Sequence, residues 1–175
     1  MSDVIEKMMS RRSIRKYKTD MVPKDILDKI LEAGTFAATG MGKQSPIMIA
    51  VTKKDVRDRL SEMVRKAKGK DEGFDPFYGA PVVISVLADK NINTHVYDGS
   101  LVIGNLMLAA YELGIGSCWI HQAKEVFATE EGKKILEEIG IKGDFEGVGQ
   151  CILGYADEEP VAKPRKDSYI YYINE

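Results

Sequence analysis

Two clusters of basic side chains lie near opposite ends of the chain. Arginine and lysine make up five of the eight residues from Arg11 to Lys18, and Ser13 adds a hydroxyl group among them. The second cluster is Lys163-Pro164-Arg165-Lys166. A guanidinium group can donate to two phosphate oxygens at once, so such clusters favour phosphate binding. Each cluster alone is also typical of a solvated surface, but together they could bind one phosphate if the fold brings them close.

The glycine pattern excludes two common nucleotide sites. The segment Gly114-Ile115-Gly116-Ser117 follows a predicted helix and precedes a predicted strand. A dinucleotide fingerprint needs the opposite order, in which a strand leads through the glycine turn into a helix. The chain also has no Gly-x-x-x-x-Gly-Lys-Ser/Thr sequence. Neither a Rossmann NAD domain nor a P-loop enzyme is therefore expected.

Histidine and cysteine spacing gives little support to metal or triad catalysis. His95 and His121 form no His-x-x-x-His or His-Glu-x-x-His pattern, and the chain has no Gly-x-Ser-x-Gly sequence. Cys118 and Cys151 lack metal-ligand spacing, and we expect both to be buried core residues in a reducing compartment. His121 follows a predicted strand, where it could face a ligand or serve as a partly exposed capping residue.

Composition indicates a globular protein with a small net charge. The chain has 175 residues, of which 44% are hydrophobic and 30% are charged, and its net charge is -2. A charge of this size argues against general nucleic-acid binding. No apolar run approaches the roughly 20 residues of a membrane span, and residues 1–12 do not resemble a secretory signal. We expect a cytoplasmic protein with no membrane or nucleic-acid partner.

Apolar periodicity predicts the helices and strands that position the basic clusters. Ile26, Leu27, Ile30 and Leu31 repeat at helical spacing, whereas residues 82–87 form the continuous β-branched run of a buried strand. Interleaved helices and strands with short links indicate one domain over residues 1–175, α+β or mixed α/β, with about four strands. The expected helices cover 3–10, 23–36, 54–66, 97–113 and 130–139, the last capped by Thr129, and the expected strands cover 47–51, 82–87, 117–120 and 148–154.

Three segments carry further expectations about burial. The helix over 97–113 is apolar nearly all round, so we expect it to be buried in the core or between subunits. The helix over 54–66 interleaves acidic with basic residues, which is typical of a solvated face. The arm over residues 157–175 ends in an apolar, strand-like stretch beyond a proline-bearing linker. An edge strand without a partner in its own chain often pairs with another subunit, so we expect a homodimer with an exchanged C-terminal arm.

Five segments, in chain order, resemble those of the FMN-dependent nitroreductase family. No single segment is decisive, but together they span almost the whole chain. Two positions depart from the family pattern: Gly42 stands where many relatives have asparagine, and the aromatic residue that follows Gln-Pro in part of the family is missing. The five segments are Arg11–Tyr17, Gly42–Pro46 (similar to Asn-x-Gln-Ser-Pro), Phe77–Pro81 before an apolar strand, Leu108–Trp119, and Lys163-Pro164-Arg165, which is similar to the family's Lys-x-Arg.

The resemblance implies an obligate homodimer with a mainly antiparallel sheet flanked by helices and two FMN sites at the subunit interface. By this likeness, the FMN phosphate contacts Arg11, Ser13, Lys163 and Arg165. Arg12 and Arg15 lie close by, with Arg15 nearer the ribityl chain or the flavin ring. A cation at that end of the ring would stabilise the anionic reduced flavin.

The resemblance also places two further segments at the flavin. A loop of the partner chain covers the ring, and the end of a strand approaches flavin N5 and O4 through backbone N–H groups. The loop residues carried over are Ala38, Thr39, Gly40, Met41 and Gly42, with Lys43, Gln44 and Ser45 at or beside the site, and the strand-end residues are Ile120, His121 and Gln122.

The activity implied is a ping-pong reaction. NADH or NADPH gives a hydride to flavin N5, and a small acceptor such as a nitroaromatic compound or a quinone then enters the same pocket. No catalytic side chain is obligatory, although His121 is a candidate proton donor. Two alternatives stay open: a flavin-binding storage or sensor protein without fast turnover, and an anion- or nucleic-acid-binding module, which the net charge disfavours.

Overall fold

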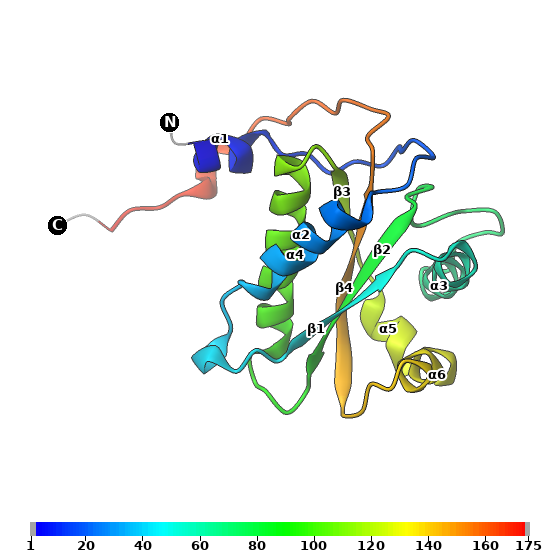
Figure 1. Cartoon of the computed structure of the whole chain (residues 1–175). Helices are drawn as coiled ribbons and strands as arrows, with labels where there is room; N and C mark the ends of the chain where they lie inside the picture. The colour runs from blue at the N-terminus through cyan, green and yellow to red at the C-terminus, as the bar shows by residue number, and fades with distance from the viewer. Residues whose placement is uncertain (1–2, 174–175) are drawn as a thin grey trace.

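The computed structural model describes residues 3–173 and contains one four-stranded sheet in that part of the chain (Figure 1). All neighbouring strands are antiparallel, and their spatial order is β1-β2-β4-β3. The predicted α+β class with about four strands is therefore confirmed. The strands are β1 (Pro46–Val51), β2 (Val82–Asp89), β3 (Gly116–Ile120) and β4 (Phe145–Gly154).

Every predicted helix is present, with small shifts at the ends. The second helix begins one residue late, because Pro23 has an extended ψ of 144° and stands at the N-cap. Thr129 Oγ1 accepts from the Gly132 amide at 3.0 Å, which confirms the predicted cap. The helices are α1 (Asp3–Ser10), α2 (Lys24–Thr35), α3 (Lys54–Ala67), α4 (His95–Glu112), α5 (Ala123–Ala128) and α6 (Glu130–Glu138), with single 3₁₀ turns η1 (Gly40–Gly42) and η2 (Asp167–Tyr169).

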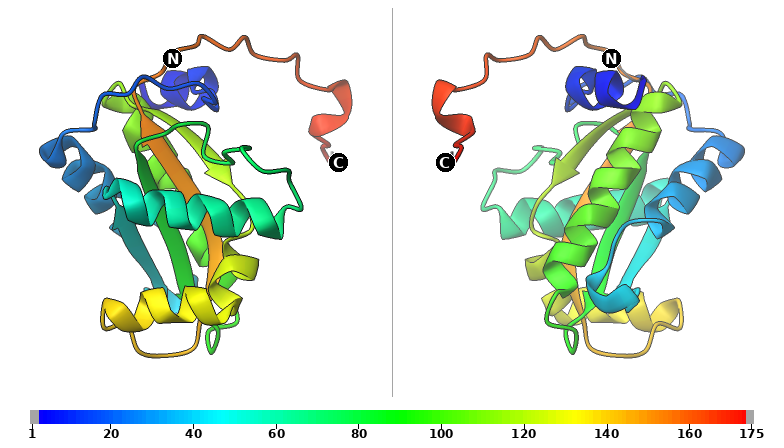
Figure 2. Two further views of the ribbon diagram at one scale, coloured as in Figure 1. Left: turned by 90° about the vertical axis from the view of Figure 1, so that its right-hand side faces the viewer. Right: turned by 90° about the vertical axis from the view of Figure 1, so that its left-hand side faces the viewer.

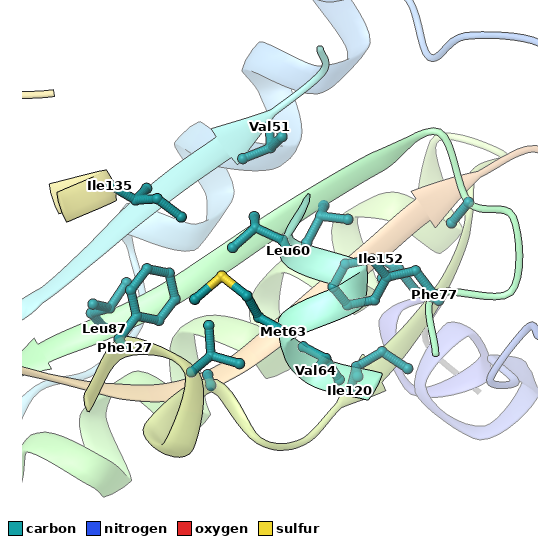
Figure 3. Close-up of a cluster of buried hydrophobic side chains, with 14 of the residues drawn as sticks. Val51, Leu60, Met63, Val64, Phe77, Leu87, Ile120, Phe127, Ile135 and Ile152 are labelled. Atoms are coloured by element: carbon teal, nitrogen blue, oxygen red, sulfur yellow. The ribbon is translucent and has the colours of Figure 1, made fainter. Parts of the chain in front are cut away.

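The sheet separates two helical layers. Helices α2 and α4 cover one face, and α3, α5 and α6 cover the other (Figures 1 and 2). Successive residues of β2 point alternately into the two layers: Val83 and Leu87 face α3, whereas Ile84 and Val86 face α4. Because both faces are covered, the strand reads as a continuous apolar run. Figure 3 shows the buried hydrophobic cluster between the sheet and the layer of α3, α5 and α6, in which Met63 of α3 lies among residues of the sheet and of α5.

Helix α4 is buried on one side only. Ile103, Leu106 and Ala110 face the sheet and have no exposed surface, whereas Tyr97 and Leu101 remain exposed. The apolar side chains Val4, Ile5, Met8 and Met9 of α1 are exposed as well. The prediction that α4 packs in the core is thus confirmed for one face, and contact of the other face with a second subunit stays a prediction.

Helix α3 departs from the prediction of a wholly solvated polar face. The Arg57 side chain is buried, donates from Nε to the Ala80 carbonyl at 3.1 Å and forms an ion pair with Asp75. The Asp75 carboxylate also accepts from Ser61 Oγ at 2.7 Å and from the Phe77 amide at 2.9 Å. Burial raises the pKa of the Asp75 carboxyl, but these donors outweigh it and lower that pKa overall. The ion pair fixes the loop that leads into β2.

The C-terminal arm leaves the body after β4. Residues 161–173 are exposed, and η2 is the only helical turn among the described residues of the arm. Figures 1 and 2 show the arm crossing above α1 and extending away from the sheet. Residues 174 and 175 of the predicted arm, like residues 1 and 2 of the predicted domain, lie outside the described residues. Between residues 3 and 173, no helix combines the length and apolar character that a membrane crossing requires.

Candidate functional site

The basic segment after α1 is fixed along the ends of two strands. The Ile14 amide donates to the Ser117 carbonyl at 2.9 Å, and the Lys18 amide donates to the Tyr155 carbonyl at 2.9 Å. A Cβ at Gly116 would meet the Ile14 side chain at 3.0 Å, so glycine allows this close approach. The segment therefore lies where β3 begins and β4 ends.

Arg11 has an unsatisfied buried donor at this place. Its Nη1 and the Ser117 Oγ are buried and have no hydrogen-bond partner among the described residues. Both residues line a cavity of about 550 Å³ together with Arg12, Glu158 and Glu159. A buried guanidinium nitrogen without an acceptor is costly, so an anion in the cavity would satisfy it.

The neighbouring basic residues have different environments. Arg12 Nη1 donates to the carbonyls of Met9 and Arg11, both at 2.8 Å, so it closes the end of α1. The backbone N–H of Arg15 donates to the Glu158 carboxylate, and its side chain is exposed. Arg11 is therefore the arginine of this segment that both lines the cavity and has a buried nitrogen without a partner among the described residues.

A thiol on β3 lies among the same cations. Burial raises the pKa of the Cys118 thiol, whereas the charges of Arg15 and Arg11 and a hydrogen bond with Ser13 act to lower it. Lys68, immediately after α3, lowers it too, and burial depresses the pKa of Lys68 itself. Sequence reasoning missed Lys68, because a lysine at a helix end followed by glycine carries no specific signal. Cys118 and Cys151 are both buried, as predicted.

The two ends of the chain meet only in part. The Asp157 amide donates to the Lys16 carbonyl at 2.9 Å, and Lys16 Nζ forms an ion pair with Asp157 at 2.8 Å. The start of the arm therefore lies against the basic segment. Lys163 and Arg165 are farther along the arm and exposed, and Arg165 donates to the Lys163 carbonyl at 3.1 Å. Their convergence with Arg11 on one phosphate stays a prediction.

The end of β3 carries a strained residue. Gln122 adopts a left-handed conformation with φ of 75° before α5, and its Oε1 is buried without a partner among the described residues. Ile120 is buried and His121 is exposed. Residues 120–122 follow Ser117 by three to five positions, or roughly 10–17 Å of strand. Strain in non-glycine residues often marks functional sites.

The loop over residues 37–45 lies at the other end of the sheet. Pro46, which follows it, pairs with Ala88, and that end of β2 pairs with the beginning of β4. The basic segment pairs beyond the end of β4, so the ten residues of that strand separate the two regions by roughly 30 Å. Figures 1 and 2 show η1 and α1 at opposite ends of the molecule. A single chain does not bring Ala38, Thr39, Gly40, Met41, Gly42 and Gln44 to Arg11.

The sequence and structure of the chain are similar to those of known proteins. A family model described as "Nitroreductase family" matches residues 8–155. A putative NADH dehydrogenase/NAD(P)H nitroreductase of Methanothermobacter thermautotrophicus is 33% identical over 122 residues, which cover 67% of this chain and 60% of the relative. A protein of the same name from Archaeoglobus fulgidus is 32% identical over 165 residues, which cover 91% of this chain and 88% of the relative.

A solved structure gives the same result. The crystal structure of a nitroreductase with bound FMN from Bacteroides fragilis superimposes with a TM-score of 0.87 and 28% identity, covering 99% of this chain and 100% of that one. The fold therefore agrees over 99% of this chain, and the family model spans most of the chain. The chain belongs to the nitroreductase family.

Proposed function

We propose that the protein is an FMN-dependent oxidoreductase that uses NADH or NADPH to reduce a small acceptor, such as a nitroaromatic compound or a quinone. The observation that carries this proposal is Arg11, which lines the cavity at the start of β3 and whose buried Nη1 has no partner among residues 3–173. Family membership and the FMN bound by the B. fragilis relative support the same cofactor.

The residues around the cavity suit a phosphate group. Arg11 offers a charged donor, and the Ser117 hydroxyl and the neighbouring Ser13 offer neutral ones. Charge-assisted hydrogen bonds of this kind offset the loss of phosphate hydration. The Glu158 carboxylate accepts from the Arg15 amide and forms no ion pair with Arg11 within residues 3–173, so the Arg11 donor stays available. Lys163 and Arg165 would complete the phosphate site from a C-terminal arm.

The end of the site away from Arg11 would hold the flavin ring. Arg12 closes α1 behind the phosphate site, and Arg15 would lie nearer the pyrimidine edge. The main chain from Ile120 to Gln122 would lie against the N5–O4 edge and leave one face of the ring open. Bound FMN would supply the hydride chemistry at N5, while the protein supplies position and electrostatics. His121 is exposed and is the candidate proton donor.

A homodimer would complete this site. The loop over residues 37–45 is roughly one strand length from Arg11 in the same chain, so only a second chain can place it over the flavin. The exposed apolar faces of α1 and α4 and the extended C-terminal arm offer surfaces for that contact. Contiguous exposed apolar patches commonly mark interfaces.

The nicotinamide and the acceptor would use the same open face of the ring in turn, which is a ping-pong mechanism. Parallel lines in double-reciprocal plots of initial rate against acceptor, at several NADH or NADPH concentrations, are expected. Intersecting lines would exclude this order. Replacement of His121 with alanine tests the proton donor, because unchanged turnover would remove it from the mechanism.

Replacement of Arg11 tests the phosphate site. FMN is titrated into the FMN-free protein and flavin fluorescence is followed. Loss of a charge-assisted hydrogen bond in Arg11→Ala is expected to raise the FMN dissociation constant roughly 10- to 100-fold. Lys18→Ala removes the same charge from an exposed position in the same segment and serves as the matched control. Equal, small effects of both variants would contradict the proposed phosphate site.

Flavin reduction distinguishes an enzyme from a storage or sensor protein. NADH or NADPH is mixed anaerobically with the FMN-bound protein in a stopped-flow instrument, and flavin absorbance is recorded. Rapid bleaching followed by recovery of colour on addition of a quinone is expected. Bound FMN that does not bleach would favour storage or sensing, and a colourless protein that takes up no FMN would contradict the whole proposal.

A further inference from the structure

One buried carboxylate holds the loop that would cover the flavin. Asp98 belongs to the first turn of α4 and is 3% exposed. Its Oδ1 accepts from the Gly40 backbone N–H at 3.0 Å. Its Oδ2 accepts from Ser45 Oγ at 3.3 Å and from Thr94 Oγ1 at 3.0 Å. Two of these three donors, Gly40 and Ser45, belong to the loop.

The Asp98 carboxylate lies where it can accept several hydrogen bonds. The first turn of a helix has backbone N–H groups without intrahelical partners, and its dipole stabilises negative charge. All three donors to Asp98 are neutral and directed at its two oxygens. Hydrogen bonds to an ionised acceptor are stronger than those between neutral groups. Asp98 can therefore hold the loop without a basic partner.

The loop is also fixed by close packing. A Cβ at Gly40 would lie 2.3 Å from Thr94 Oγ1, so the backbone of η1 rests directly on the residue before α4. Within the loop, Thr39 Oγ1 accepts from the Gln44 amide at 3.1 Å, and the Thr39 carbonyl accepts from the Gly42 amide at 3.0 Å. The loop is therefore a compact unit attached to α4 through Asp98 and Thr94.

This attachment maintains a strained and exposed conformation. Met41 has φ of 53° and Gln44 has φ of 50°, and Met41 is 90% exposed. Left-handed backbone in such residues persists only where the surroundings impose it. Because the side chains of Met41 and Gln44 are exposed and make little packing contact themselves, the attachment of the loop to α4 decides where they lie.

We propose that Asp98 is a positioning residue that holds residues 39–45 in the conformation in which they cover the flavin and bound substrates of the partner subunit. The inference rests on the proposed function and adds a residue that touches neither cofactor nor substrate. Asp98 acts through Gly40 and Ser45. Its loss displaces the loop over the ring while leaving the phosphate end at Arg11 intact.

Steady-state kinetics of the FMN-bound protein test this role. Asp98→Ala removes both acceptor oxygens. We expect the KM for 1,4-benzoquinone to rise roughly tenfold or more, because small displacements of positioning groups have effects of this size. The FMN dissociation constant should change less than the roughly 10- to 100-fold expected for Arg11→Ala. An unchanged quinone KM would overturn the proposal.

Three further variants separate positioning from general destabilisation. Asp98→Asn keeps an oxygen that can accept from the Gly40 amide, so its KM for the quinone should lie much closer to the wild-type value than that of Asp98→Ala. Gly40→Ala leaves Asp98 in place but forces η1 away from Thr94, so it should reproduce the KM increase of Asp98→Ala. Asp89→Ala removes a carboxylate that accepts from Asn91 and not from the loop, and should leave the KM unchanged. If Asp98→Ala does not fold, a Gly40→Ala variant with the wild-type KM would overturn the proposal.

Hydrogen exchange separates failure of this inference from failure of the proposed function. In the FMN-free protein, Asp98→Ala should accelerate exchange of the Gly40 amide by roughly 10- to 100-fold, while peptides of β2 and β4 exchange as in the wild type. If the protein binds no FMN, the proposed function fails, but this measurement still tests the attachment. Unchanged exchange at Gly40 would overturn the proposal whether or not FMN binds.

Discussion

Two loops of this protein are each held by an aspartate, and the partners of the two aspartates differ. Asp75 fixes the loop between α3 and β2 through an ion pair with the buried Arg57, a serine hydroxyl and two backbone amides. Asp98 holds the loop between α2 and β1 through the Gly40 amide and the Ser45 hydroxyl, and it also accepts from the hydroxyl of Thr94 before α4. A cation neutralises the first carboxylate, whereas only neutral donors surround the second.

The two loops also differ in how many non-glycine residues have left-handed backbone and in whether these residues are exposed. The loop before β2 has one left-handed non-glycine residue, Tyr78, which is partly buried and packs against the core. The loop before β1 has two, Met41 and Gln44, and both are exposed. An ion pair to a buried arginine contributes to the stability of the whole fold. A carboxylate with neutral donors chiefly determines the conformation of one loop.

The largest effect is expected from breaking the ion pair. Asp75→Ala leaves Arg57 buried with only Asp58 as an ionic partner, at 3.1 Å. The free energy of unfolding should fall by about 2–4 kcal/mol, near the lower part of the range for a broken buried pair because Asp75 is partly exposed. Urea denaturation measures the change. Asp71→Ala, in an exposed part of the same loop, is the control, and an equal effect of both would contradict this role of Asp75.

A smaller loss of stability is expected at the other loop. Asp98→Ala leaves the Gly40 amide and two hydroxyls without their acceptor, which should lower the free energy of unfolding by about 1–3 kcal/mol. The same urea titration applies. If Asp98→Ala destabilises the fold more than Asp75→Ala does, the proposed contrast between the two loops is wrong.

Lowering the pH should remove the contribution of Asp75 to the free energy of unfolding. Its folded-state pKa is lower than the ordinary value, so the stabilisation is fully present above about pH 4 and is lost as the pH falls through the folded-state pKa. The stability difference between the wild type and Asp75→Ala should therefore shrink as the pH is lowered below about 4. Urea titrations across this range test the sign. A difference that grows on acidification would contradict the pKa direction.

The smallest effect is expected from an exposed ion pair on the same helix as Arg57. Lys54 pairs with Asp58 one turn later, and its side chain is 90% exposed. Lys54→Ala should lower the free energy of unfolding by about 0.3–0.5 kcal/mol, because solvent screens exposed i,i+4 pairs. Thermal unfolding with and without added salt measures it. A loss as large as that of Asp75→Ala would mean that burial does not set the difference.

Local pattern predicted most of the elements. Helical periodicity and β-branched runs identified four strands and five of the helices within one or two residues at most ends. Helix α5 was missed because its six residues, Ala123–Ala128, are too few to show a helical period. Strand β4 begins at Phe145, three residues before the predicted start, because Glu146 and Gly147 interrupt the apolar pattern there.

The candidate site was predictable where residue type carries chemistry. The cluster around Arg11 and the likeness of five segments to the nitroreductase family pointed to a phosphate site, and family membership is confirmed. Lys68, Ser117 and Asp98 were not found, because none belongs to a recognisable pattern. Each becomes relevant through its surroundings. Lys68 acts on the Cys118 thiol, Ser117 lines the same cavity as Arg11, and Asp98 accepts from the Gly40 amide of the loop.

The amino-acid order alone determined the apolar periods, the basic clusters and the family likeness, since these depend on neighbouring residues and their side-chain chemistry. The tertiary structure decided that Arg57 is buried, that Arg11 Nη1 is buried without a partner within residues 3–173, and that the loop at Met41 lies a strand length away from Arg11. The physical reason is that burial and hydrogen-bond satisfaction depend on groups distant in sequence, which only the packed sheet and helices bring together.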